Sequence, residues 1–242
     1  MKNEVQYDIG DYTVRWVSYL DLLGFTELVE TKDWFDVFSC YDKAVKSCTN
    51  VPGFTPKIEK TCFSDTFLLY SPDNSASSFD AIEKTTRWFT YWLIYFGIPV
   101  RGAMSYGDFY AHKESNIFFG PALIEAYRYG ENQDWIGFVL TPSAINQMAA
   151  INLPANKRLN YAYWDIPYKK AAYCASARKD ARILQKSLPA YIIGGNLSLN
   201  GRNLCLDKLC EMKGKLKDER LIRKYENTIN FIVANKRVKE GR

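Results

Sequence analysis

A mostly apolar, β-rich run is the first clear feature of the hydrophobic pattern. It occupies YTVRWVSYLDLLGF, from residue 12 onward, and has the composition of a central strand of a sheet. The run stops at Gly24, and the TELVE that begins at Thr26 has a helical pattern. We therefore predict a strand, a glycine turn and a helix over residues 12–47.

Two pairs of short β-rich runs predict hairpins. The first pair, KIEKTCF and TFLLYS, is separated by the polar Ser64 and Asp65, which places Asp65 at a strand end. The second pair makes up IPVRGAMSYGDFYAHK, and we place its turn near residues 105–107. Between the hairpins the pattern predicts a helix from about residue 77 to residue 96.

The remaining pattern continues to alternate between strands and helices. GPALIEAYRYGEN has helical spacing, and IGFVLTPSAINQM predicts a strand leading into a helix. Further strand material is expected within 157–173 and 190–194, and residues 201–235 are mostly helical by pattern. The predicted fold class is α+β, a sandwich with a mostly antiparallel central sheet and helices packed on it. We expect a catalytic domain over 1–200 and a basic helical C-terminal extension over 201–242.

Charge and composition narrow the function classes. With 242 residues, of which 47% are hydrophobic and 24% charged, the chain has the size of one catalytic domain with an appendage. Residues 201–242 hold 12 Lys and Arg against 6 Asp and Glu, whereas the rest holds 20 against 21. Because the charges of this tail are mixed in sign, we expect a solvated helix face rather than a nucleic-acid surface.

Cysteine usage and the start of the chain indicate a cytosolic protein. The six cysteines form no CxxC pair, and MKNEVQYDIGDY lacks the apolar core of a signal peptide. The most apolar run, residues 88–96, is about half the length that crosses a bilayer. His112 is the single histidine of the sequence, so a Ser-His-Asp or Cys-His catalytic arrangement would have to include it.

Two aspartates at predicted strand ends carry the candidate chemistry. Hard divalent cations prefer oxygen ligands and bridge phosphate chains, so Asp21 and Asp65 at one sheet edge would suit two-metal phosphoryl transfer. After Asp21, the amides of Gly24, Phe25 and Thr26 open a helix and could bind the β- and γ-phosphates of a triphosphate. Arg101 lies within a predicted strand, where a buried charge is expected to be ion-paired.

These residues resemble the motifs of the class III nucleotidyl cyclases. The first strand of that family ends in Asp-x-x-Gly-Phe-Thr, here DLLGFT, and its second metal aspartate ends the next hairpin, here FSD. Gly120 opens a segment ending at Arg128 that is similar to the family's Gly-x-x-Val-Asn-x-Ala-Ala-Arg helix. The likeness covers about residues 12–170.

The resemblance implies a head-to-tail homodimer with two composite active sites. Asp21, Leu22 and Asp65 of one chain would hold two Mg²⁺ or Mn²⁺ ions, and Arg128 of the other chain would complete the site. One ion would activate the ribose 3′-hydroxyl for attack on the α-phosphorus, the other would hold the phosphates, and Arg128 would stabilise the developing charge. The implied products are a 3′,5′-cyclic nucleotide and pyrophosphate.

Several positions depart from the family pattern. The asparagine four residues before the arginine is replaced by Ile124, which cannot donate a hydrogen bond. The family's triphosphate-binding lysine is matched by Lys169 or Lys170, and the residues alone do not choose between them. The base-reading positions hold Thr61 and Ile117, where purine cyclases have charged or thiol side chains.

Without a charged partner at Thr61, the usual route to purine recognition is missing. A small cyclase domain with DLLGF, FSDT and VRGAMSYGDF is similar to the pyrimidine cyclases of Pycsar antiphage systems. This likeness implies UTP or CTP as substrate, cUMP or cCMP as product, and a separate effector that the product activates. A threonine hydroxyl suits uracil and cytosine equally.

Other readings stay open at this point. Ile124 is compatible with a cyclase-fold protein that binds nucleotide without turnover, and a purine-using class III cyclase is a further alternative. A palm-type polymerase or dinucleotide cyclase shares the two-aspartate arrangement, but the central hairpin CFSDT does not resemble GGDEF.

Overall fold

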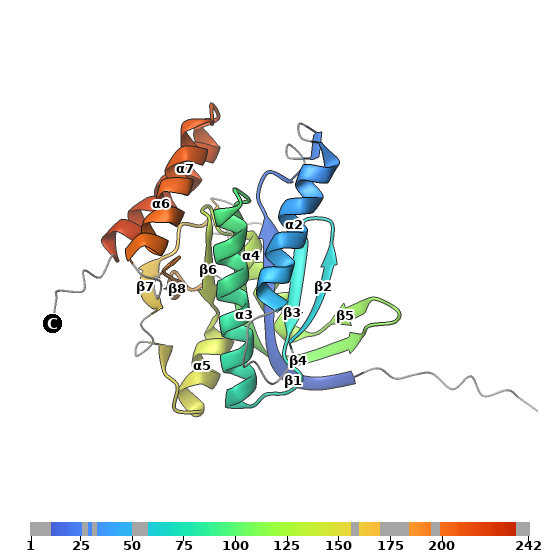
Figure 1. Cartoon of the computed structure of the whole chain (residues 1–242). Helices are drawn as coiled ribbons and strands as arrows, with labels where there is room; N and C mark the ends of the chain where they lie inside the picture. Colours follow the sequence, from blue (N-terminus) through green and yellow to red (C-terminus); the bar gives the residue numbers. More distant parts are fainter. Residues whose placement is uncertain are drawn as a thin grey trace, which may run out of the picture.

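The computed structural model describes residues 11–25, 29–30, 33–49, 58–155, 160–169, 184–194 and 199–235. Helices and strands alternate through this part of the chain (Figure 1). The strands are β1 (Asp11–Leu22), β2 (Glu59–Phe63), β3 (Thr66–Tyr70), β4 (Val100–His112), β5 (Ile117–Phe119), β6 (Gly137–Leu140), β7 (Tyr161–Asp165) and β8 (Ser187–Tyr191). The helices are α2 (Trp34–Thr49), α3 (Ala76–Tyr95), α4 (Pro121–Glu131), α5 (Pro142–Ala150), α6 (Leu199–Gly214) and α7 (Glu219–Ala234).

One sheet organises the described residues. Its strand order is β2-β3-β1-β4-β6-β8-β7, and β5 pairs with β4 at the side. β4 and β6 run parallel, and the other described pairs are antiparallel. α2 and α3 cover one face of the sheet, and α4 lies behind it (Figure 1). The predicted α+β class with a mostly antiparallel sheet is confirmed.

The central strand β1 is apolar on both faces because both faces are covered. Trp16 and Leu20 belong to the main core with Phe79 and Ile82 of α3, and all four side chains are fully buried. Val17 points to the opposite face, into a smaller cluster with side chains of β3, β4 and α4. Since side chains alternate along a strand, Tyr19 and Asp21 share the face of Val17.

The first predicted hairpin is confirmed, and the second was placed wrongly. β2 and β3 are joined by Ser64 and Asp65, with Ser64 at φ 55°. The predicted turn at 105–107 lies inside β4, which pairs with β1 without interruption from Leu22–Val100 to Asp11–Ala111. The actual turn falls at 113–116, between β4 and β5. The long partner strand β1 supplies a ladder that overrides the local turn signal of Gly107.

Helices α6 and α7 form an antiparallel pair against the edge of the domain (Figure 1). Phe231 of α7 packs on Trp135 and Trp164, with ring centroids 5.1 and 5.4 Å apart. The buried hydroxyl of Thr228 accepts a hydrogen bond from the amide of Ile136 at 2.9 Å. These contacts make the helix pair part of the main core. Within the described chain, every helix is too short or too polar to span a membrane.

Replacing Thr228 by Val tests this anchor. Valine has nearly the same shape but leaves the buried amide of Ile136 without an acceptor, so we expect the free energy of unfolding to fall by about 1–3 kcal/mol. Urea denaturation followed by circular dichroism measures the change. Thr85→Val is the matched control, because the Thr85 hydroxyl is partly buried and only donates to Ala81 within its own helix. Equal stability of the two variants would contradict the anchoring role.

Candidate functional site

The ends of β1 and β3 bring Asp21 and Asp65 together. Asp21 pairs with Thr66 across the two strands, and the amide of Leu22 donates to the carbonyl of Asp65 at 3.0 Å. Burial raises the pKa of the Tyr41 hydroxyl, and the negative charges of Cys62, Asp65 and Asp21 add to the effect. The hydroxyl of Tyr41 on α2 is therefore affected by the charge of both carboxylates, which lie at the same end of the sheet.

Arg101 links Asp21 to a second acidic residue that the sequence pattern did not single out. Nε and Nη2 of Arg101 lie 2.9 and 2.8 Å from Oδ2 of Asp21, and Nη2 lies 2.9 Å from Oε2 of Glu131. Nη1 donates to the carbonyl of Gln133 at 3.2 Å. The expected ion pair of Arg101 is confirmed, with Asp21 as its partner.

Burial and charge act in opposite directions on this cluster. Burial raises the pKa of Asp21 to about 6, against the lowering effect of Arg101, and the charge of Glu131 adds to the rise. For Glu131, Arg101 and Lys169 outweigh burial and hold the pKa of the carboxyl below its usual value. Nζ of Lys169 lies 3.6 Å from Oε2 of Glu131. The cluster therefore places acidic and basic groups in direct contact at the end of β1.

The turn after β1 presents backbone amides beside these groups. The amides of Leu22 and Leu23 donate to the carbonyls of Asp65 and Pro99. No described backbone carbonyl accepts a bond from the amide of Gly24 or Phe25. Gly24 has φ +71°, a conformation that favours glycine. The third predicted phosphate-binding residue, Thr26, lies outside the described residues.

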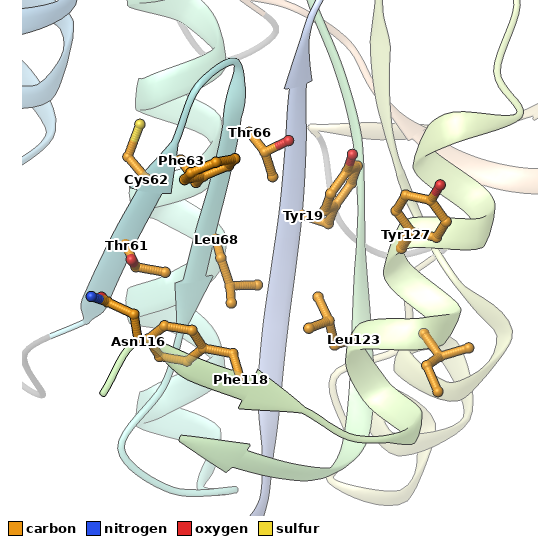
Figure 2. Close-up of a pocket in the computed structure, with 11 residues that line it drawn as sticks. Tyr19, Thr61, Cys62, Phe63, Thr66, Leu68, Asn116, Phe118, Leu123 and Tyr127 are labelled. Atoms are coloured by element: carbon orange, nitrogen blue, oxygen red, sulfur yellow. The ribbon is translucent and has the colours of Figure 1, made fainter. Parts of the chain in front are cut away.

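A cavity of about 900 Å³ opens on the sheet face that Tyr19 shares with Asp21. Figure 2 shows its walls: β2 and β3 on one side, α4 on the other, and the β4–β5 hairpin below. Its lining is mainly apolar and carries no charged side chain, and consists of Tyr19, Thr61, Cys62, Phe63, Thr66, Leu68, Asn116, Phe118, Leu123, Ile124 and Tyr127. The volume is that of a small-molecule site.

Tyr19 connects this cavity to the acidic cluster. Its ring lines the cavity, and its hydroxyl donates to Oε1 of Glu131 at 3.2 Å. Burial raises the pKa of the Tyr19 hydroxyl, against a hydrogen bond with Thr66. A ligand that fills the cavity would thus extend toward the carboxylates along Tyr19.

Of the two predicted base-reading residues, one lines the cavity. Thr61 does so from β2, whereas Ile117 lies on β5, 48% exposed, and is not part of the lining. The neighbouring Asn116 lines the cavity instead, from a turn position with φ 53°. An amide both donates and accepts hydrogen bonds, so Asn116 adds a polar contact that the sequence reasoning missed.

The remaining predicted residues lie on or near α4. Ile124 is 56% exposed and lines the cavity, one turn before the half-buried Arg128. No described carboxylate forms an ion pair with Arg128, which leaves its guanidinium available to a ligand or a second chain. Lys169 reaches the acidic cluster through Glu131, and Lys170 lies outside the described residues.

The donor set at the strand ends fits Mg²⁺ or Mn²⁺. The described residues contain no group of three or more His, Cys, Asp and Glu arranged to hold a metal ion. Magnesium usually keeps several waters and takes one or two carboxylates together with substrate phosphates. Asp21, Asp65 and the carbonyl of Leu22 meet that requirement. Arg101 contacts only Oδ2 of Asp21, so Oδ1 is not engaged by this ion pair.

Comparison with solved structures identifies the fold. The catalytic core of a rhodopsin-guanylyl cyclase with converted specificity, in complex with ATPαS, matches with a TM-score of 0.51 and 13% identity, over 74% of this chain and 94% of that chain. The guanylate cyclase domain of RhGC from Catenaria anguillulae, in complex with GTP, matches with a TM-score of 0.52 and 12% identity, over 75% and 96%. No protein-family model and no curated protein matches the sequence. The chain has the fold of class III nucleotidyl cyclase domains.

Proposed function

We propose that this protein is a nucleotidyl cyclase that makes a 3′,5′-cyclic nucleotide and pyrophosphate from a nucleoside triphosphate. The observation that carries the proposal is the meeting of Asp21 and Asp65 at neighbouring strand ends, beside the amides of Gly24 and Phe25, in a cyclase fold. Two of the similar structures are complexes with GTP and ATPαS, which supports a nucleoside triphosphate as the ligand.

Each group has a distinct task in the proposed reaction. Asp21, Leu22 and Asp65 would hold two divalent ions, which would supply Lewis-acid chemistry for the 3′-hydroxyl and the phosphates. The amides of the turn bind phosphate oxygens at a helix start. Arg128 of a second copy stabilises the charge that develops on the α-phosphoryl oxygens.

We also propose a homodimer, which the exposed part of the cavity wall supports. Phe63 is 85% exposed, and Ile124 and Tyr127 are 56% and 53% exposed, all three beside one cavity. Large apolar side chains that gather on one face are typical of a protein–protein interface. A second copy over this face would complete two sites and would carry Arg128 to the triphosphate.

We propose a pyrimidine, uracil or cytosine, as the base. The lining of the cavity contains hydroxyl and amide groups but no charged residue, and Thr61 and Asn116 can both donate and accept hydrogen bonds. Such a lining can pair with uracil carbonyls or a cytosine amine. On this proposal the product is cUMP or cCMP, and it acts on a separate effector in antiphage defence.

Product identification tests the function. Purified protein is incubated with Mn²⁺ and each of the four nucleoside triphosphates, and cyclic products are identified by mass spectrometry. We expect cUMP or cCMP as the product. Formation of cAMP or cGMP instead would support cyclase activity but refute the pyrimidine assignment. Absence of product from all four would favour nucleotide binding without turnover, a function that Ile124 and the Arg101–Asp21 ion pair also support.

A further inference from the structure

A second cleft lies between the turn after β1 and the C-terminal helix pair. Its volume is about 330 Å³. The cleft is bounded by the turn Leu22–Phe25, by the turn 96–99 that joins α3 to β4, and by α6 and α7. The side of this cleft formed by the helices carries Lys208, Glu211, Met212, Lys215, Leu216, Leu221, Lys224 and Tyr225. One wall is therefore the phosphate-binding turn, and the other carries three lysines.

The three lysines differ in their ion pairs. The Nζ atoms of Lys208 and Lys215 lie 2.9 and 2.6 Å from carboxylate oxygens of Glu211, so the two ammonium groups share one carboxylate. No described carboxylate lies within ion-pair distance of Lys224. The nearby Asp134 is bound by Arg223 instead, at 2.9 Å. The charged side chains lining the cleft thus carry an excess of positive charge.

The surroundings of Lys224 repel its charge. The side chain is half-buried, and burial lowers the pKa of its ammonium group, with the nearby charges of Arg101 and Lys169 adding to the effect. The negative charges of Asp134 and, to a smaller extent, Asp21 oppose that effect in part. Lys224 lines the cleft from α7, and the turn Leu22–Phe25 lines the same cleft. The cleft is lined by three lysines and one carboxylate, and such an excess of cations is typical of a site for a polyanion.

Lys224 is also held by a rigid element. Its carbonyl accepts a hydrogen bond from the buried hydroxyl of Thr228, which is bonded in turn to Ile136. The side chain of Asp218 caps the start of α7 through the amide of Arg220 at 2.7 Å. The lysine thus extends from a fixed helix rather than from a loop, which lowers the entropy cost of using it to bind a ligand.

We propose that the C-terminal helix pair belongs to the substrate site, and that Lys224 binds the polyphosphate end of the nucleoside triphosphate opposite the amides of Gly24 and Phe25. This inference rests on the proposed function for the identity of the ligand. It gives α7 a role in substrate binding, and the triphosphate lies between β1 and α7. Lys224 then supplies a cation from the same chain that carries Asp21 and Asp65.

Tripolyphosphate binding to the full-length protein tests Lys224 without reference to turnover. We expect Lys224→Met to weaken tripolyphosphate binding in isothermal titration by about tenfold or more, since a charge-assisted hydrogen bond is lost. Lys224→Arg keeps the charge and should bind within about threefold of the wild type. Lys217→Met is the matched control, because Lys217 is exposed and does not line the cleft. Equal binding by wild type and Lys224→Met would overturn the proposal.

Steady-state kinetics separate the substrate from a free polyphosphate. If the ligand is the substrate, Lys224→Met raises KM for the nucleotide by about tenfold with a smaller change in kcat, and tripolyphosphate competes with the nucleotide. Binding of tripolyphosphate that depends on Lys224 but does not compete with nucleotide would overturn the assignment to the substrate. Absence of cyclic product from the wild type would refute the proposed function alone, because the titration still reports on Lys224.

Amine footprinting on the wild-type protein gives a measurement that needs no variant. Acetylation of Lys224 by an activated ester, followed by peptide mass spectrometry, should slow at least severalfold when tripolyphosphate is added. Lys217 should react at an unchanged rate. Unchanged acetylation of Lys224 in saturating tripolyphosphate would contradict the proposal even if Lys224→Met failed to fold.

Discussion

Replacement of Asp65 by Asn is expected to lower the rate of cyclic nucleotide formation by about a thousandfold or more, because the proposed metal site would lose a ligand worth several kcal/mol. The fold should persist, since the strand contact of Asp65 is made by its backbone carbonyl with the amide of Leu22. Asp21→Asn should reduce the rate to a similar extent. Product formation in the presence of Mn²⁺ is measured by mass spectrometry. A titration with Mn²⁺ measures the affinity of each variant for the ion.

Asp108→Asn is the control for both changes. Asp108 is exposed on β4 and lies opposite Val14, far along the strand from the carboxylates. Its loss of charge should leave the rate within about twofold of the wild type, given the small effects of surface substitutions. An Asp65→Asn enzyme with more than a tenth of the wild-type rate would refute the metal-site assignment.

Replacement of Arg101 by Met is expected to lower the free energy of unfolding by about 3 kcal/mol, because it leaves the buried carboxylate of Asp21 and the partly buried carboxylate of Glu131 without their shared cation. The side chain of Arg101 is 7% exposed, and those of Asp21 and Glu131 are 11% and 25% exposed. Urea denaturation at neutral pH measures the loss, because the ion pairs among all three groups contribute to the stability of the wild type at that pH. Activity should fall as well, since Arg101 orients Asp21.

Arg223→Met is the matched control for this stability effect. Arg223 also pairs with one aspartate, Asp134, but its side chain is 56% exposed, so its loss should cost less than about 1 kcal/mol. Adding Asp21→Asn and Glu131→Gln to Arg101→Met removes the uncompensated charges and should restore about half of the stability. A loss that the two amide changes do not reduce would point to packing rather than charge.

Most of the fold could be predicted from the sequence because its local signals agree with its long-range pairing. The apolar run before Gly24 predicted β1, and the polar Ser64 and Asp65 predicted the first hairpin, in agreement with the structure. The second hairpin was misplaced because the turn signal at Gly107 is local, whereas the partner strand that overrides it lies almost a hundred residues earlier in the chain. A short stretch of sequence around Gly107 does not include that partner strand and cannot indicate the pairing.

The candidate site could be predicted in part, for the same reason. Asp21, Asp65 and the turn were visible as motifs, since each sits at a strand end. Glu131 and Asn116 were missed, although Glu131 lies three residues after Arg128 at the end of a predicted helix. Their relevance depends on tertiary contacts with Arg101 and with the cavity. Lys224 was visible only as one charge among many in a basic tail.

The packing of Phe231 against Trp135 and Trp164 constrains how this chain unfolds. A helix pair whose largest fully buried side chain, Phe231, packs in the core cannot melt by itself, because two tryptophans would then face solvent. The last helices and the central sheet should accordingly lose structure in one cooperative transition. A chain cut near residue 200 would not be a smaller intact domain but an incompletely packed one.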